Sequence, residues 1–138
     1  MSTQQLNVLL VEDDEVDVMT VKRAFEKNHI TNPLFVASDG VEALEKLRNS
    51  EMPTARRLVL LDLNMPRMSG IEFLRELRKD PELASTPVVV LTTSNDDQDK
   101  VEAYDLNVAG YILKPVTFSS FCDVMVALNK YWSLVELP

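Results

Sequence analysis

Short apolar runs alternate along the chain with longer segments in which apolar residues recur at helical spacing. The short runs are rich in Val, Leu and Ile, and polar or turn-forming residues follow each of them. Continuous apolar runs of this kind are typical of strands that are covered on both faces, as in a parallel sheet. The pattern therefore predicts buried strands at Val8–Val11, Leu34–Ala37, Leu58–Leu61, Val88–Leu91 and Tyr111–Leu113.

The segments between and after these runs predict helices. Ser69, with Glu72 three residues later, forms a capping box that begins one helix, and Asp80–Pro81 ends it. The last helix has the clearest apolar stripe, whereas residues 97–106 predict only a weak helix. The apolar positions are Val18, Val21 and Phe25; Val41, Leu44 and Leu47; Ile71, Leu74 and Leu77; and Phe118, Phe121, Met125, Leu128 and Trp132.

A strand–helix unit thus repeats along the chain, and no linker or low-complexity segment divides it. Strands that alternate with helices imply right-handed crossovers onto one parallel sheet, so we predict an α/β fold. We expect a single domain over residues 1–138, with a core at about residues 6–131 and an apolar C-terminal tail at residues 132–138. In such sheets ligands bind beyond the carboxyl ends of the strands.

Reactive side chains follow four of the predicted strands. Strands one, three, four and five can be neighbours in this architecture, so we expect their ends to converge on one pocket. That pocket would hold several carboxylates, a hydroxyl and an ammonium group. The residues are Glu12, Asp13 and Asp14 after the first strand, Asp62 and Asn64 after the third, Thr92 after the fourth and Lys114 after the fifth.

These residue types indicate phosphoryl chemistry. Crowded carboxylates repel one another unless a cation lies among them. Mg²⁺ fits such a pocket, because it typically binds one or two carboxylates together with water and phosphate oxygens. Lys114 and Thr92 would then hold an anionic ligand. A phosphoryl group satisfies both the metal and the lysine, and an aspartate beside it can act as the nucleophile and form an acyl phosphate.

Composition excludes several other functions. The chain has 14 basic and 22 acidic residues and a net charge of −8, so it lacks the cationic excess with which proteins bind nucleic acid. No apolar run is long enough to cross a membrane, and residues 1–7 contain no secretory signal, so we expect a cytoplasmic protein. Cys122 and His29 are each the only residue of their type. We expect Cys122 in the core and His29 at the surface.

The motifs at the strand ends are LVEDD (Leu10–Asp14), LDLNMP (Leu61–Pro66), VLTT (Val90–Thr93) and GYILKP (Gly110–Pro115). In this order and at these intervals they resemble the receiver domains of response regulators in two-component signalling. The resemblance extends over about residues 6–131. It implies a flavodoxin-like, doubly wound (βα)₅ fold with a five-stranded parallel sheet in the strand order 2-1-3-4-5.

The resemblance also implies which residues hold the metal and the phosphoryl group. Asp62 would accept the phosphoryl group from a sensor histidine kinase. Asp13 would bind Mg²⁺ directly and Glu12 would bind it through water. Asp62 and the backbone carbonyl of Asn64 would complete the protein's ligands.

Three further residues would form the switch. Lys114 would pair with the acceptor carboxylate and then with the phosphate, and the Lys114–Pro115 peptide bond would be cis. Thr92 would close on a phosphate oxygen, and Tyr111 would turn inward as Thr92 moves. The resemblance therefore implies a phosphoacceptor switch that takes part in its own phosphorylation and dephosphorylation, rather than a conventional enzyme.

Several features of the sequence resemble those of the single-domain regulators that are paired with bacterial phytochromes. The acidic pair is Glu12–Asp13 where many receivers have two aspartates, and the connections at residues 49–57 and 79–87 are long. The resemblance implies a sensor histidine kinase as partner, for which a bacterial phytochrome is our candidate. The signal would leave by phosphorylation-dependent protein contact or by phosphorelay to a downstream protein that the sequence does not identify.

Other readings of the same residues stay open. Each residue has a plain structural explanation, such as a helix cap or a solvated charge, but these would have to coincide at four strand ends. A haloacid-dehalogenase-like phosphohydrolase would need a second aspartate where Asn64 stands. A flavodoxin-like flavin carrier would need a Ser, Thr and Gly-rich loop where Glu12, Asp13 and Asp14 would repel phosphate.

The C-terminal tail bears on the oligomeric state. It carries Leu134, Val135 and Leu137 beyond a helix whose apolar stripe already covers the sheet. The tail can fold back onto its own domain or pack against a second subunit. We expect the second arrangement, a homodimer with two-fold symmetry, because contiguous apolar patches tend to be hidden.

Overall fold

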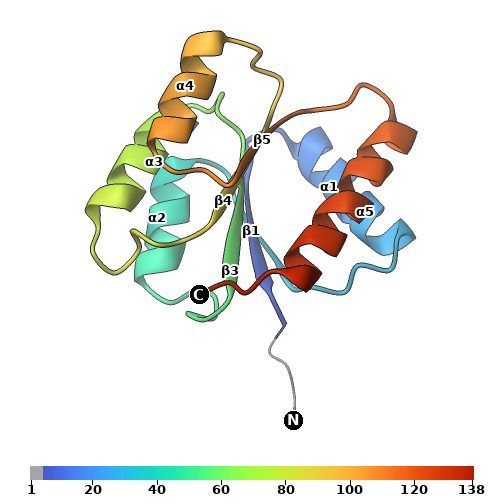
Figure 1. Ribbon diagram of the computed structural model, residues 1–138, viewed down its shortest axis with the longest axis horizontal. Helices are drawn as coiled ribbons and strands as arrows, with labels where there is room; N and C mark the ends of the chain where they lie inside the picture. The colour runs from blue at the N-terminus through green and yellow to red at the C-terminus, as the bar shows by residue number, and fades with distance from the viewer. Residues whose placement is uncertain (1–4) are drawn as a thin grey trace.

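Five strands form one parallel sheet in the computed structural model, which describes residues 5–138 (Figure 1). The strand order is β2-β1-β3-β4-β5, which confirms the predicted topology. The first four residues, part of the segment in which the sequence shows no secretory signal, lie outside the described residues. The strands are β1 (Asn7–Val11), β2 (Leu34–Ala37), β3 (Arg57–Leu61), β4 (Val88–Thr92) and β5 (Gly110–Leu113), and each contains the apolar run predicted for it.

The helices cover both faces of the sheet. In Figure 1, α1 and α5 lie on one side of the sheet and α2, α3 and α4 on the other. This division follows from right-handed crossovers, because the chain moves outward from β1 to β2 and then in the opposite direction from β3 to β5. Within residues 5–138, no helix combines the length and the apolar character needed to span a membrane. The bounds are α1 (Glu15–Lys27), α2 (Gly40–Arg48), α3 (Gly70–Lys79), α4 (Asp97–Asp105) and α5 (Phe118–Leu134).

The sheet separates two apolar cores. Every residue of β1, β3 and β4 is buried, and successive side chains point to opposite faces. Leu9 therefore packs beneath α2 and α3, whereas Leu10 packs against α1 and α5 with Cys122 and Trp132. Cys122 is buried and His29 is exposed, as predicted. The continuous apolar runs thus reflect strands that are covered on both sides.

Side chains at the helix ends begin and end the helices at the predicted places. Asp14 accepts hydrogen bonds from two amides at the start of α1. The capping box of Ser69 and Glu72 begins α3, and Asp80 ends it. Ala103 is the one buried residue of α4, which agrees with the weak pattern of that segment. The caps satisfy amides that have no partner within the helix.

The C-terminal tail returns to its own domain. Helix α5 continues to Leu134, so Trp132 belongs to the helix and is buried at 2% exposure. Leu137 packs against the core beneath α1 and α5, and the carbonyl of Pro138 accepts a hydrogen bond of 3.0 Å from the amide of Arg56. The tail thus adopts the fold-back arrangement, and the expectation that it packs against a second subunit instead is wrong. Leu134 is 76% exposed.

We predict that Gly70→Ala lowers the free energy of unfolding by about 1–3 kcal/mol. A methyl group at this position would lie 2.6 Å from the carbonyl oxygen of Asp62 and 2.7 Å from the Cα of Leu63, so the backbone after β3 would have to move. Urea unfolding measures the change. Gly110→Ala is the matched control, because its methyl group would have 4.0 Å of clearance from Val89. Equal losses in both variants would show that the close approach at Gly70 has no special importance.

Candidate functional site

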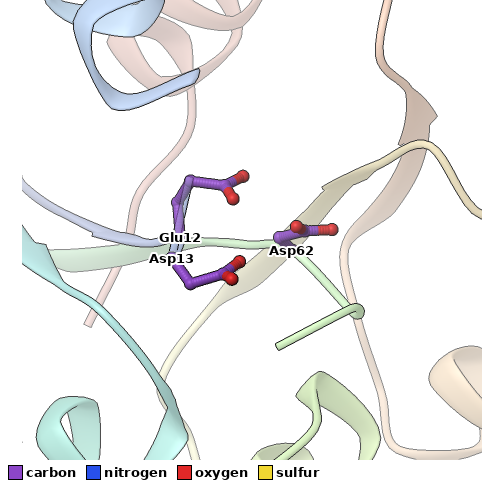
Figure 2. Close-up of side chains that lie close together, drawn as sticks. All are labelled: Glu12, Asp13 and Asp62. Atoms are coloured by element: carbon purple, nitrogen blue, oxygen red, sulfur yellow. The ribbon is translucent and has the colours of Figure 1, made fainter. Parts of the chain in front are cut away.

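Three carboxylates meet at the carboxyl ends of β1 and β3. Glu12, Asp13 and Asp62 each place an oxygen within 4.8 Å of the others, and Figure 2 shows the three side chains pointing to the same side. The amide of Asp62 donates to Val11 and that of Glu12 donates to Ala37, so the ladder continues one residue past each strand. Glu12 and Asp62 are 3% and 7% exposed, whereas Asp13 is exposed.

Lys114 brings a single ammonium group to these carboxylates. Its amide donates to the carbonyl of Thr92, which places the side chain just past β5. The Nζ atom lies 2.5 Å from Glu12 and 2.8 Å from Asp17. It lies 3.6 Å from Oδ2 of Asp62, which is an ion pair beyond hydrogen-bonding distance. The predicted pairing with Asp62 is therefore present, but two other carboxylates hold the ammonium more closely.

Burial and hydrogen bonds shift the pKa values of two groups in this cluster. Burial raises the pKa of Glu12 to about 7, even though hydrogen bonds from Lys114 and from the amide of Asp14 act in the opposite direction. Burial alone would lower the pKa of Lys114, but hydrogen bonds to Asp17 and Glu12 outweigh it and raise the pKa. The lysine thus stays charged, and the most buried carboxylate resists ionisation.

Thr92 and Lys114 approach different carboxylate oxygens of Asp62. The Thr92 hydroxyl is fully buried and donates a 2.7 Å hydrogen bond to Oδ1 of Asp62, while Lys114 approaches Oδ2. The amide of Asn64 also lies 3.4 Å from Oδ1. The carboxylate is therefore oriented from two sides. The predicted metal contact of the Asn64 carbonyl stays a prediction.

Tyr111 connects to Thr92 through Ser94. The Tyr111 hydroxyl donates a 2.9 Å hydrogen bond to the carbonyl of Ser94, and the amide of Ser94 donates to the Thr92 hydroxyl at 3.3 Å. Tyr111 is half-buried and packs against the core on the α4 side of the sheet. The two predicted switch residues are thus linked by one short loop, and their movement stays a prediction.

The Lys114–Pro115 peptide bond differs from the expectation. Residues 5–138 contain no cis peptide bond, so this bond is trans. The two isomers of an X–Pro bond differ by only about 0.5–1 kcal/mol, and the sequence motif alone therefore does not decide between them.

An ion pair that the sequence analysis missed secures the loop after Asp62. Arg67 has a left-handed backbone with φ of 61°, and its guanidinium lies 2.6 Å from Oδ2 of the buried Asp39. Asp39 also caps α2 through the amide of Glu42. Burial opposes ionisation of Asp39, but these hydrogen bonds outweigh it and lower its pKa. No local pattern reveals this pair, because its members lie on different loops.

Asp17 is a second site residue that the sequence analysis missed. It lies in the first turn of α1, directly after the acidic residues at the end of β1. A signal was available, because the first turn of a helix that follows a parallel strand lies at the edge of the sheet where ligands bind. The sequence analysis considers only Glu12, Asp13 and Asp14 as metal ligands or partners of the helix dipole, and Asp17 lies beyond them.

The donors present suit a hard divalent cation. Glu12, Asp13 and Asp62 offer carboxylate oxygens only, and Asp13 is open to solvent. Oxygen ligands combined with water are the preference of Mg²⁺, which seldom uses a complete cage of protein ligands. The structure therefore brings together the predicted Glu12, Asp13, Asp62, Thr92 and Lys114 in a site that fits such an ion.

Comparisons of sequence with known proteins agree with this geometry. Residues 8–125 match the family model of the response regulator receiver domain. The probable methanogenesis regulatory protein FilR2 of Methanothrix harundinacea is 38% identical over 127 residues, which cover 91% of this chain and 82% of the relative. Response regulator Rcp1 of Synechocystis is 34% identical over 138 residues, which cover 95% of this chain and 92% of Rcp1.

Solved structures give the same result. The phosphorylated cyanobacterial phytochrome response regulator RcpA superposes with a TM-score of 0.86 at 34% identity, and the match covers 98% of this chain and 99% of RcpA. The Mn²⁺-bound form of Rcp1 superposes with a TM-score of 0.83 at 34% identity over 96% of this chain and 99% of that chain. With its matching fold and strand-end residues, the chain belongs to the family of response-regulator receiver domains.

Proposed function

We propose that this protein is a cytoplasmic, single-domain response regulator that accepts a phosphoryl group on Asp62 from a sensor histidine kinase. The main support is the placement of Asp62, whose carboxylate is held by the Thr92 hydroxyl at 2.7 Å and faced by the Lys114 ammonium at 3.6 Å. A nucleophile, a hydroxyl donor and a cation in this arrangement suit transfer of an anionic group. The protein acts as a switch and passes the signal by protein contact or phosphorelay.

The reaction uses both sides of the Asp62 carboxylate. One carboxylate oxygen attacks the phosphorus of a phosphohistidine, the P–N bond breaks, and its electron pair returns to the imidazole. The product is an acyl phosphate on Asp62. Lys114 then pairs with the charge of the phosphoryl oxygens, and the Thr92 hydroxyl moves its hydrogen bond to one of them. Because Ser94 joins Thr92 to Tyr111, this movement reaches the surface near α4.

A divalent cation completes the proposed site. Asp13, Asp62 and the Asn64 carbonyl would bind Mg²⁺ directly, and Glu12 would bind it through water. The ion supplies positive charge that offsets the charge of the transferring group. The carboxylate oxygens of Glu12, Asp13 and Asp62 support this assignment, as does the Mn²⁺-bound form of the relative Rcp1.

We propose a phytochrome-type histidine kinase as the partner. RcpA is a cyanobacterial phytochrome response regulator, and this chain matches nearly its whole length. The bacteriophytochrome response regulator RtBRR is also similar, with a TM-score of 0.75 at 34% identity.

The first prediction concerns the acceptor. Asp62→Asn keeps the oxygen that accepts from Thr92 but removes the nucleophilic charge, so acetyl phosphate with Mg²⁺ should add no phosphoryl mass to this variant. Intact-protein mass spectrometry measures the addition. The variant should unfold at the same or a higher urea concentration, because one of several repelling carboxylates is gone. Labelling at the wild-type rate would exclude Asp62 as the acceptor.

The second prediction concerns pH and the metal. The pKa of Glu12 is about 7 in the folded protein against an ordinary 4.5, so between these values the folded state holds a proton that the unfolded state has released. In EDTA, the free energy of unfolding should therefore decrease as pH rises from about 4.5 to about 7. The raised pKa of Lys114 acts only at alkaline pH. Mg²⁺ should stabilise the protein more at pH 7.5 than at pH 5, because it binds the ionised site.

Glu12→Gln is the control for this pH dependence. It keeps the size of the side chain but cannot ionise, so the decrease between the two pH values should become smaller. Urea unfolding at several pH values, with EDTA or with Mg²⁺, gives the comparison. The same decrease in both proteins would assign it to other groups.

The third prediction concerns the homodimer, which we propose on the outer face of α5. Val126, Tyr131 and Leu134 are exposed on this helix at 47%, 40% and 76%. Leu134→Glu should convert a dimer into a monomer in light scattering at tens of micromolar protein without slowing the phosphorylation of Asp62.

Truncation after Tyr131 is unsuitable as a test of the dimer, because it removes the buried Trp132. Val101→Glu on α4 is the control. A wild-type monomer, with or without phosphate, would rule out the dimer.

A further inference from the structure

Asp17 holds the catalytic lysine from outside the site that the receiver motifs define. Its carboxylate accepts a 2.8 Å hydrogen bond from Lys114, while the acceptor Asp62 is 3.6 Å from the same ammonium. We propose that Asp17 is a positioning residue that restrains Lys114 in the unphosphorylated protein and so slows phosphorylation. This inference rests on the proposed function of Asp62.

Helix α1 does not need the bond between Asp17 and Lys114 in order to form. Asp14 already caps α1 by accepting from the amides of Val16 and Asp17, and the Asp17 side chain is 39% exposed. An acidic residue in a first turn also interacts favourably with the helix dipole, but that interaction does not require a lysine partner. The bond to Lys114 instead joins α1 to the end of β5 across 97 residues of sequence.

Most of the hydrogen-bonding capacity of Lys114 is already occupied. Its ammonium offers three hydrogen-bond donors, and Glu12 and Asp17 occupy two of them. One donor therefore remains for a phosphoryl group on Asp62 as long as Asp17 keeps its bond to the ammonium. Glu12 also belongs to the carboxylate cluster that suits a cation, whereas Asp17 stands apart from that cluster. Asp17 is therefore the partner that continues to compete for Lys114 when the site is loaded.

The expected size of the effect is modest. Ion pairs between partly exposed groups contribute little, so releasing Lys114 should accelerate phosphorylation about two- to fivefold. Removing any negative charge near the site would also speed the reaction with an anionic phosphoryl donor. That effect should be smaller when the carboxylate that is removed does not contact Lys114. Glu15 provides this comparison, since it is exposed, lies in the same first turn of α1 and forms no ion pair with Lys114 in the described part of the chain.

The test compares initial rates of phosphorylation by acetyl phosphate at fixed Mg²⁺, followed by intact mass. Asp17→Asn should react about two- to fivefold faster than wild type, and Asp17→Glu should return the rate toward the wild-type value. Glu15→Gln, which removes a charge from the same helical turn, should stay close to wild type. In a Lys114→Met background, Asp17→Asn should have no further effect, because there is no ammonium to release. Urea unfolding verifies that each variant is folded.

The outcomes separate this inference from the proposed function. If the wild type accepts no phosphoryl group on Asp62, the proposed function fails and this inference fails with it. If the wild type is labelled on Asp62 but Asp17→Asn is no faster, only the role of Asp17 is wrong. An equal acceleration in Glu15→Gln, or an acceleration that persists without Lys114, would likewise overturn the restraint in favour of a general effect of charge.

Discussion

The site depends on one ammonium group that several carboxylates surround. Lys114 contacts Glu12 and Asp17 and approaches Asp62, so it offsets only part of the negative charge at this edge of the sheet. Burial raises the pKa of Glu12, and the nearby charge of Asp62 adds to this effect. The carboxylate oxygens that Lys114 leaves uncompensated are the ligands that suit a divalent cation.

The sheet fixes this arrangement with little help from the side chains themselves. Parallel register aligns the ends of β1, β3, β4 and β5, and backbone hydrogen bonds extend past the strands at Asp62 and Lys114. Apolar cores on both faces prevent the strands from shifting, because a slip by one residue would turn every buried side chain to the opposite face. The carboxylates can therefore stay close together although they repel one another.

The loops around Asp62 differ in how firmly they are held. Gly70 lies against the backbone of Asp62, and Arg67 binds Asp39 on the neighbouring loop, so the loop after Asp62 is closely held. The opposite side has fewer constraints, since α4 buries only Ala103. Among the helices α1 to α5, α4 has the fewest buried residues, so the apolar cores hold it least firmly.

The sequence by itself determined the fold class, the strand order and most of the site, because buried strands and helix caps leave local patterns and the strand-end motifs occur in a fixed order. It placed Asp62, Thr92 and Lys114 together correctly. Tertiary structure alone decided the pairing of Lys114 with Asp17, the ion pair of Arg67 with Asp39, the trans Lys114–Pro115 bond and the return of the tail to its own core. These features join segments far apart in the chain or have nearly equal alternatives, so the packed surroundings select among them.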